Sequence, residues 1–306
     1  MTAWFRELPP AGGPSAAGPS AVMSWTGGSR AGGPRTGGPS AVEPRTGGSS
    51  VAGGGRDSRT TPRDATTGLR LYCFPHAGGS AGAFTPLARA LAAGRREGPR
   101  VTVSVAAAQY PGRQDRYRER PWEDIGAIAD VLAAEIRARD ERPYALFGHS
   151  MGAVVAYETA RRLQRSPGPG PARLFVSGRD SPSAGPVATD HVPDDEALLA
   201  HIRRLGGTGS RVLDDPELVA MALPALRADY RALRSYVWAS GEPLDCPLTV
   251  LVGDADPLVT DAGAAAWRGL SASTTTVRLL PGGHFYLDDC ARQVAQLVRD
   301  ALPTPV

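Results

Sequence analysis

Hydrophobic residues recur along most of the chain in two alternating patterns. Short apolar runs of strand length alternate with longer segments in which apolar residues return every three or four positions, the spacing of an amphipathic helix. This alternation predicts an α/β protein with a mostly parallel sheet and helices on both of its faces. We expect strands at 69–74, 101–106, 173–178, 248–253 and 276–280, a further strand from Tyr144 toward Ser150, and helices at 84–93, 125–139, 153–163 and 291–302.

The alternation stops in one internal segment, between Ser181 and about Pro243. Only helical patterns are present there, at 194–205, 216–223 and 226–237. Active sites of parallel sheets lie at the carboxyl ends of the strands, and long insertions at such places often serve as lids. We therefore expect residues 181–243 to form a helical lid over an active site. The alternative is an additional helical layer that packs elsewhere.

Residues 1–65 differ in composition from the rest of the chain. Gly, Pro, Ser, Thr, Ala and Arg dominate this segment, and the motif at 18–22 returns at 38–42 without helical or strand periodicity. Such a segment offers too little apolar surface to offset the conformational entropy that ordering would cost. We expect a disordered low-complexity tail over 1–65 and a single α/β domain over 66–306.

Charge and composition exclude several functional classes. Lys and Arg number 34 against 31 Asp and Glu, so the formal net charge of +3 gives no reason to expect nucleic acid or a membrane as a partner. No apolar run approaches the roughly 20 residues that a membrane-spanning helix needs. The amino terminus has no apolar segment of the kind found in secretory signals. These features predict a cytoplasmic protein.

The chain has three cysteines, Cys73, Cys246 and Cys290. Because they are odd in number and far apart, neither a disulfide framework nor a metal cluster with close ligand spacing is expected. Their neighbours are strand-like or lie near the last helix, so we expect buried thiols in a reducing compartment. No metal and no other cofactor is expected.

The first candidate for chemistry is Ser150, which lies in a Gly-x-Ser-x-Gly motif between a strand-like run and a helical pattern. This arrangement is typical of a nucleophile elbow, a strained strand-to-helix turn that exposes a serine hydroxyl above a sheet. Gly148 and Gly152 fit the motif because neighbouring backbone passes too close to the turn for a Cβ. The alternative is a Gly-rich turn with an incidental serine.

A serine hydroxyl needs a neighbouring base, most often a histidine that a carboxylate orients. In chains with this elbow the order is Ser, then Asp or Glu, then His. Of the five histidines, only His284 follows a late strand and satisfies that order. We therefore expect His284 to act as general base and acid. The alternative is a surface or capping histidine.

Two carboxylates follow the strand at 248–253. Asp254 could cap the turn through its own backbone, whereas Asp256 precedes Pro257 and is therefore biased toward an extended conformation. The spacing of Asp256 after the strand favours it as the residue that orients the histidine. Asp254 remains the alternative, and Asp180 after the preceding strand is a weaker one.

A tetrahedral oxyanion needs backbone donors aimed at it. One expected donor is the amide of Met151, directly after the nucleophile. The second should come from the loop after the strand at 69–74, where we choose the amide of Ala77 in a His-Ala-Gly-Gly sequence. The competing interpretation is a phosphate-binding turn, but the Gly-Lys pattern of a nucleotide cradle is absent there.

Several motifs together resemble a known family. From about Leu69 to Leu302 the chain is similar to the stand-alone, or type II, thioesterases of polyketide and nonribosomal peptide assembly lines. The motifs are CFPHAGGS at 73–80, YPGR at 110–113, FGHSMGA at 147–153, LGGT at 205–208, LRADY at 226–230 and GGHF at 282–285.

The resemblance implies an α/β-hydrolase fold with a helical lid. It also implies a serine hydrolase that cleaves acyl thioesters from the phosphopantetheine arms of acyl- or peptidyl-carrier proteins, an editing role, by a Ser-His-Asp triad through an acyl-enzyme. The alternatives are a carboxylesterase or lipase that acts on oxygen esters and an acyltransferase that acts on carrier thiols.

Carrier proteins tend to be acidic, so basic residues near the lid are candidate docking positions. The alternative for each of them is an ordinary solvated charge. The candidates are Arg113, Arg116, Arg118, Arg120, Arg203, Arg204 and Arg211.

Overall fold

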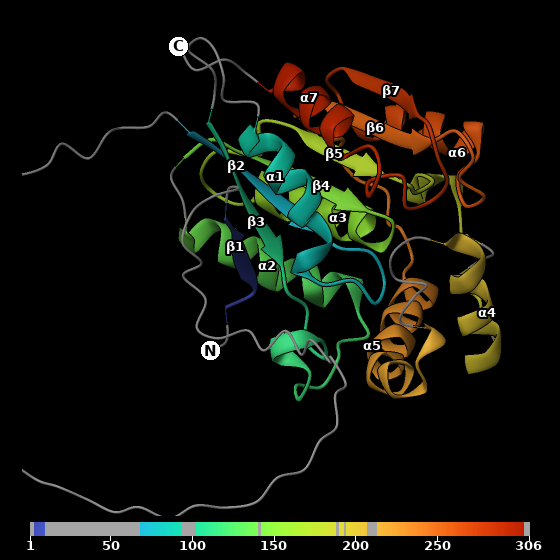
Figure 1. Cartoon of the computed structure of the whole chain (residues 1–306). Coiled ribbons are helices and arrows are strands. Elements are labelled where there is room, and N and C mark those ends of the chain that lie inside the picture. Colours follow the sequence, from blue (N-terminus) through green and yellow to red (C-terminus); the bar gives the residue numbers. More distant parts are fainter. Residues whose placement is uncertain are drawn as a thin grey trace, which may run out of the picture. The chain divides into compact units, whose positions relative to one another are not determined.

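The computed structural model describes residues 3–9, 68–93, 102–139, 142–187, 190–192, 194–206 and 213–302 (Figure 1). These residues contain a seven-stranded sheet of order β1-β3-β2-β4-β5-β6-β7, in which every neighbouring pair is parallel except β1 and β3. The predicted α/β class with a mostly parallel sheet is confirmed. The strands are β1 (Phe5–Leu8), β2 (Gly68–Phe74), β3 (Thr102–Ala108), β4 (Tyr144–His149), β5 (Leu174–Ser177), β6 (Leu248–Gly253) and β7 (Thr275–Leu280).

Helices cover both faces of the sheet, as the sequence predicts (Figure 1). Helices α1 (Thr85–Ala93) and α7 (Ala291–Ala301) bury apolar residues such as Leu87 and Val294 in one cluster. Helices α2 (Ile125–Arg139) and α3 (Met151–Arg165) bury Ile128 and Val154 in a second cluster on the other face. Because β4 lies at the centre of the strand order, its carboxyl end and Ser150 are fixed between two packed layers.

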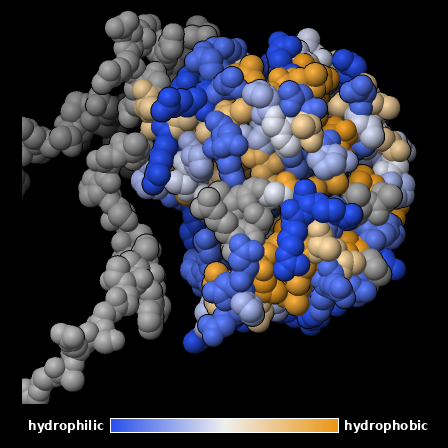
Figure 2. Space-filling model, turned by 45° about the vertical axis from the view of Figure 1, so that its right-hand side comes forward, coloured by the Kyte–Doolittle hydropathy of each residue, from blue (hydrophilic) through white to orange (hydrophobic). Residues whose placement is uncertain are grey.

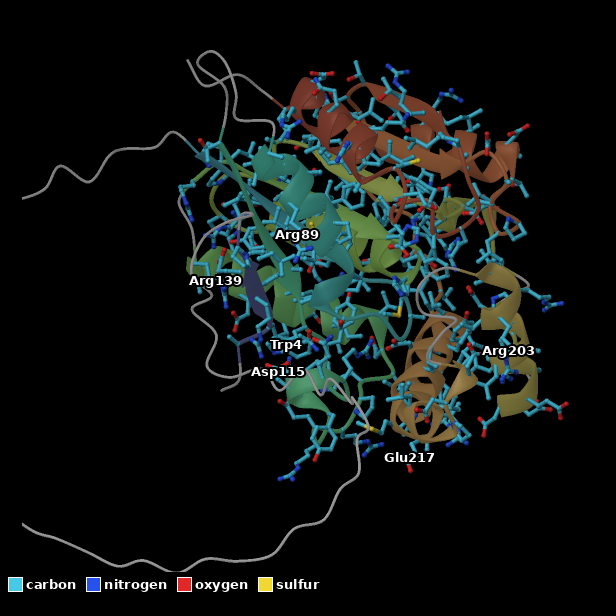
Figure 3. All side chains as sticks on the ribbon, in the orientation of Figure 1. Trp4, Arg89, Asp115, Arg139, Arg203 and Glu217 are labelled. Atoms are coloured by element: carbon cyan, nitrogen blue, oxygen red, sulfur yellow. The ribbon has the colours of Figure 1, made fainter. Side chains whose placement is uncertain are left out.

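The amino-terminal boundary of the predicted tail is wrong. Phe5 to Leu8 form β1, which pairs antiparallel with β3 from Phe5 opposite Ala108 to Leu8 opposite Val105. Trp4 and Phe5 are buried, and Arg6 is paired with Asp115, which Figure 3 labels beside Trp4. A four-residue strand is too short to show periodicity next to a long low-complexity segment. Residues 10–65 lie outside the described residues, so the rest of that prediction stays a prediction.

The insert at 181–243, which we call the lid, contains helices α4 (Asp195–Leu205) and α5 (Pro216–Ser235). Asp194 and Asp215 cap their amino ends, accepting hydrogen bonds from backbone amides of the first turns. The described part of the lid also holds a 3-10 helix, Pro182–Ala184, and no strand.

The prediction of two separate helices at 216–223 and 226–237 is wrong, because α5 continues through Pro224. Proline removes one backbone donor and crowds the preceding turn, which usually ends a helix. Here the residues that follow Pro224 bury a continuous face of Ala225, Leu226, Ala228, Asp229, Ala232 and Leu233. That packing holds the second half, whereas residues 216–223 before the proline are exposed or half-buried.

Three further features of the described residues bear on the predictions. A short helix α6 (Asp261–Ala266) runs into a 3-10 helix, Trp267–Leu270, which the sequence did not predict. Cys73, Cys246 and Cys290 are free and buried, as predicted. Within the described part of the chain, no helix combines the length and the hydropathy that crossing a membrane would require.

Candidate active site

Ser150 occupies a strained turn between β4 and α3. Its backbone has φ 55° and ψ −119°, a conformation that L-residues rarely adopt. A Cβ on Gly148 would lie 2.1 Å from the carbonyl oxygen of Gly152, and a Cβ on Gly152 would lie 1.9 Å from that of Phe74. The two glycines therefore allow three backbone segments to meet beneath the serine, and this contact holds the strained turn in place.

His284 and Asp256 meet after β7 and β6. The Nδ1 atom of His284 lies 2.9 Å from Oδ2 of Asp256, and both side chains are buried. The other carboxylate oxygen of Asp256 accepts a hydrogen bond of 2.9 Å from the amide of Leu258. When Nδ1 donates its proton to Asp256, the Nε2 atom of His284 carries the lone pair that a general base needs.

The alternative carboxylates have other partners. Oδ1 of Asp254 accepts a hydrogen bond of 2.9 Å from the amide of Gly282, so this exposed residue braces the turn before His284. Asp180 accepts hydrogen bonds from the amide and hydroxyl of Thr260. The geometry therefore joins Asp256 to His284, whereas Asp254 braces the turn before His284 and Asp180 binds Thr260.

The loop at 76–80 follows β2 and carries the predicted donor Ala77. The amide of Gly78 donates to the Asp229 carboxylate at 2.7 Å, and the amide of Gly79 donates to the His76 carbonyl at 2.9 Å. Among the described residues, neither the Ala77 amide nor the Met151 amide has a protein acceptor in the hydrogen-bond network. Ala77 lines the cavity at Ser150, whereas Met151 is buried and its role as a donor stays a prediction.

Ser150, His284 and Ala77 line one cavity of about 160 Å³. The lid supplies most of its apolar wall, and Phe285 and Tyr230 also line it. Its size and its lining suit a short, mainly apolar group next to the serine. The apolar residues contributed by the lid are Ile202, Leu205, Leu213, Ala222 and Leu226.

Two further histidines surround His284, and the sequence did not predict this cluster. The ring of His149 lies 5.0 Å from that of His284 and 5.9 Å from that of His76. Its Nδ1 atom is 2.9 Å from the hydroxyl of Ser177, which in turn contacts the Tyr286 hydroxyl at 2.6 Å. Among the described residues, Nε2 of His149 has no hydrogen-bond partner.

Burial keeps the histidines around His284 neutral. It holds the pKa of His149 well below its ordinary value, and the nearby charges of His284 and His76 lower it further. Burial also lowers the pKa of His76 to about 4, with His284 adding to the effect. Near pH 7 both rings are uncharged, so they place no fixed positive charge beside His284.

Two of the predicted docking arginines are buried, which corrects that prediction. Arg113 is 7% exposed and forms a bidentate pair with Asp229 of α5, with nitrogen–oxygen distances of 2.7 and 2.9 Å. Arg116 is 4% exposed, pairs with Glu119 and lies over the ring of Trp4. Arg113 lies in the YPGR motif and Asp229 in the LRADY motif. Neither motif alone indicates that these two residues form an ion pair.

Comparisons with known proteins agree with this geometry. A model of the thioesterase domain family matches residues 69–302. The chain is 44% identical over 219 residues to a protein of Streptomyces griseus named probable cadicidin biosynthesis thioesterase, which covers 72% of this chain and 58% of that protein. It is 42% identical over 235 residues to thioesterase PikA5 of Streptomyces venezuelae, with 76% and 81% covered.

A solved structure extends the likeness to the fold. The type II thioesterase BorB from the borrelidin biosynthetic cluster superimposes with a TM-score of 0.69 at 44% identity, covering 78% of this chain and 94% of that chain. The chain thus spans 58% of the first relative, 81% of the second and nearly all of BorB.

Proposed function

The chain belongs to the thioesterase family, and we propose that it hydrolyses acyl thioesters on the phosphopantetheine arms of carrier proteins in polyketide or nonribosomal peptide synthesis. The observation that carries this proposal is the position of Ser150 at a strained elbow, in one cavity with a His284 that is hydrogen-bonded to Asp256. In that synthesis its role is to remove acyl groups that stall on the carrier.

In the first step the Ser150 hydroxyl attacks the thioester carbonyl, and its proton passes to Nε2 of His284. Asp256 stabilises the resulting imidazolium through Nδ1. The amides of Ala77 and Met151 donate to the tetrahedral oxyanion. When the carbon–sulfur bond breaks, the thiolate leaves with the electron pair, takes the proton from His284, and leaves the acyl group on Ser150.

In the second step a water molecule replaces the thiol. His284 takes a proton from the water as it attacks the acyl-serine ester, and the same two amides donate to the second oxyanion. The carbon–oxygen bond to Ser150 then breaks, and His284 returns the proton to the serine oxygen. The products are a free carboxylic acid, a free pantetheine thiol and the original hydroxyl.

The leaving group determines which part of the site matters most. A thiol with a pKa near 8.5 leaves far more readily than an alkoxide, so its protonation contributes little to the barrier. Stabilisation of the oxyanion then remains the main task of the protein. The two amide donors should therefore affect turnover of thioesters strongly.

Exposed basic residues on and near the lid fit an acidic carrier protein. Arg118, Arg120 and Arg204 are exposed, as is Arg203 of α4, which Figure 3 labels. Figure 2 shows mainly hydrophilic residues, with hydrophobic ones between them, on the face that turns forward. The predicted candidate Arg211 lies outside the described residues. Carrier docking through these exposed residues is part of the proposal, whereas the buried Arg113 and Arg116 take no part in it.

The test compares one acyl group on three acceptors. The enzyme is incubated with the acyl group on a carrier protein, on a pantetheine thioester and on a matching oxygen ester, with Ser150→Ala as the background. We expect equal amounts of free acid and free thiol, and a higher kcat/KM for the thioesters. Faster turnover of the oxygen ester would indicate a carboxylesterase, and transfer of the acyl group to a second thiol would indicate an acyltransferase.

A further inference from the structure

A buried ion pair connects the core of the protein to the lid helix α5. Asp229 of α5 is 1% exposed and Arg113, from the loop after β3, is 7% exposed. The guanidinium and the carboxylate meet in a bidentate arrangement at 2.7 and 2.9 Å. Because the loss of hydration offsets much of the attraction between two buried charges, such a pair is weak evidence for added stability. A role in orienting neighbouring backbone explains the Arg113–Asp229 pair better.

Both members of the pair also bind the 76–80 loop. Oδ2 of Asp229 accepts a hydrogen bond of 2.7 Å from the Gly78 amide, and Nη1 of Arg113 donates to the Gly79 carbonyl at 3.2 Å. These bonds hold the Gly78 amide and the Gly79 carbonyl, which follow Ala77 in the loop. The Gly78 amide is thereby engaged by Asp229. The Ala77 amide, one peptide earlier, has no protein acceptor among the described residues, and Ala77 lines the cavity.

The lid helix also contacts this loop through packing. Gly78 has φ +74°, and a Cβ added to it would lie 2.4 Å from Cδ2 of Leu226, which is close to Asp229 on α5. On the core side, the Gln109 side chain accepts from the Ala81 amide and donates to the Arg113 carbonyl, both at 3.0 Å. The loop is therefore held from two sides, by α5 and by the segment at 109–113.

We propose that Arg113 and Asp229 are positioning residues that orient the Ala77 amide toward the oxyanion. The orientation of this amide then depends on how α5 packs against the core. This inference rests on the proposed function, since an oxyanion forms only during acyl transfer. It extends that function by making a lid helix part of the device that orients a donor. Neither residue lines the cavity at Ser150, and both act through the Gly78 amide and the Gly79 carbonyl.

The expected signature is a loss of kcat with little change in KM. A misplaced donor weakens binding of the transition state more than binding of the ground state. Removal of one oxyanion donor lowers kcat by roughly 100- to 1,000-fold in a serine protease, and a displacement of about 1 Å costs roughly 100-fold. For Asp229→Asn we therefore expect a loss of about 100-fold in kcat and a change of less than about threefold in KM.

The matched control is Glu158, a second buried carboxylate of the core. It pairs with Arg161 and Arg162 and accepts a hydrogen bond of 2.8 Å from Tyr236, just after α5, but it does not contact the 76–80 loop. Glu158→Gln therefore removes a buried charge that also links the core to the lid. A general loss of stability should affect both variants, whereas a loss of positioning should affect Asp229→Asn alone.

The experiment measures kcat and KM for a small pantetheine thioester well below the melting temperature of each variant. It also measures the inhibition constant of a trifluoromethyl ketone that forms a tetrahedral adduct with the serine. We expect Asp229→Asn to lose kcat and inhibitor affinity by similar factors. Arg113→Lys, which keeps the charge without the bidentate geometry, should lose less, and Glu158→Gln should stay within about threefold of the wild type.

The inference is wrong if folded Asp229→Asn keeps kcat and inhibitor affinity within threefold of the wild type, or if Glu158→Gln loses as much. If Asp229→Asn does not fold, Arg113→Lys takes its place. The inference is then wrong if folded Arg113→Lys keeps the kcat and the inhibitor affinity of the wild type. Failure of the wild-type protein to hydrolyse any thioester would instead overturn the proposed function, so the two failures are distinguishable.

Discussion

The turn at Ser150 and the 76–80 loop line the same cavity, yet different forces hold them in place. The turn is fixed by backbone contacts within five residues and by the adjoining end of β2, against which Gly152 lies. The loop is fixed by side chains from 109–113 and from α5, far away in the sequence. Backbone contacts between neighbouring residues can be predicted from a short sequence motif. Contacts between side chains of distant segments can be seen only in the folded structure.

The largest contrast should come from adding one methyl group to each region. In Gly152→Ala the new Cβ meets the Phe74 carbonyl oxygen at 1.9 Å, and the surrounding backbone cannot yield cheaply. We expect a loss of more than about 4 kcal/mol in unfolding free energy, to the point of little folded protein. Circular dichroism during thermal unfolding would measure it. Melting within a few degrees of the wild type would contradict the backbone contact.

Gly78→Ala is the matched change in the loop, and it should be milder. The new Cβ meets the flexible end of Leu226 at 2.4 Å, and the positive φ adds a strain of roughly 1–3 kcal/mol. The protein should fold while kcat falls by about tenfold or more, because the loop moves relative to α5. Adding Leu226→Ala should recover part of the lost kcat, and the absence of any recovery would count against the packing explanation.

Single exchanges of the two aspartates sharpen the contrast between a reacting group and a turn residue. Asp256→Asn keeps the shape of the side chain but favours the wrong tautomer of His284, so kcat should fall by about 10⁴-fold. Asp254→Asn weakens only the hydrogen bond to the Gly282 amide. It should lower kcat by less than about tenfold, because Asp254 is not hydrogen-bonded to His284. Steady-state kinetics on one thioester would separate them. A larger loss in Asp254→Asn would reverse the assignment.

The pH dependence of stability tests the histidine that precedes Ser150. The pKa of His149 is near 6.5 in the unfolded chain and well below that in the fold, so below pH 6.5 the unfolded state binds a proton that the folded state does not. Stability attributable to the neutral ring is therefore present above that pH and falls as the pH drops, by up to about 1.4 kcal/mol per unit.

The control for this effect is His149→Asn, whose amide can replace Nδ1 as a partner of Ser177. The difference in unfolding free energy between the wild type and His149→Asn should shrink as the pH is lowered from 7.5 to 5. Urea unfolding at several pH values would measure it. A difference that stays constant over this range would show that His149 does not resist protonation.

The smallest expected effect concerns the exposed arginines, which belong to neither region of the site. Arg118→Glu and Arg204→Glu should raise KM for an acidic acyl-carrier protein by a few fold and leave KM for a small thioester unchanged. The effect should diminish as salt is added, since exposed charges are screened. Equal changes for both substrates would exclude carrier docking at these positions.

The sequence was informative where the constraint is local. The strand-helix alternation led to the parallel sheet, and the helix at 125–139 was predicted with its observed bounds. The elbow motif and the strand before it placed Ser150 at a sharp turn, because close backbone contacts require glycine at fixed spacings. His284 was chosen from chain order and Asp256 from its spacing after the strand at 248–253, and the structure brings these two side chains into hydrogen-bonding distance.

Features that depend on tertiary packing could not be predicted in the same way. Strand β1 is only four residues long and is stabilised by pairing with β3. Helix α5 continues through Pro224, and its buried residues all follow the proline. Arg113 and Arg116 look like surface charges in the sequence. Asp229 is the distant partner of Arg113, and the ring of Trp4 lies against Arg116, which also pairs with nearby Glu119.

The most direct test of the proposed chemistry is the release of an acyl group from a phosphopantetheine-bound carrier by the wild type and by Ser150→Ala. Melting curves would establish that both proteins are folded. The released acid and the free thiol are both quantified in the same reaction. We predict stoichiometric release by the wild type and a rate at least about 10³-fold lower in Ser150→Ala, because the acyl-enzyme cannot form. Release by folded Ser150→Ala within tenfold of the wild-type rate would contradict the assignment of Ser150 as the nucleophile.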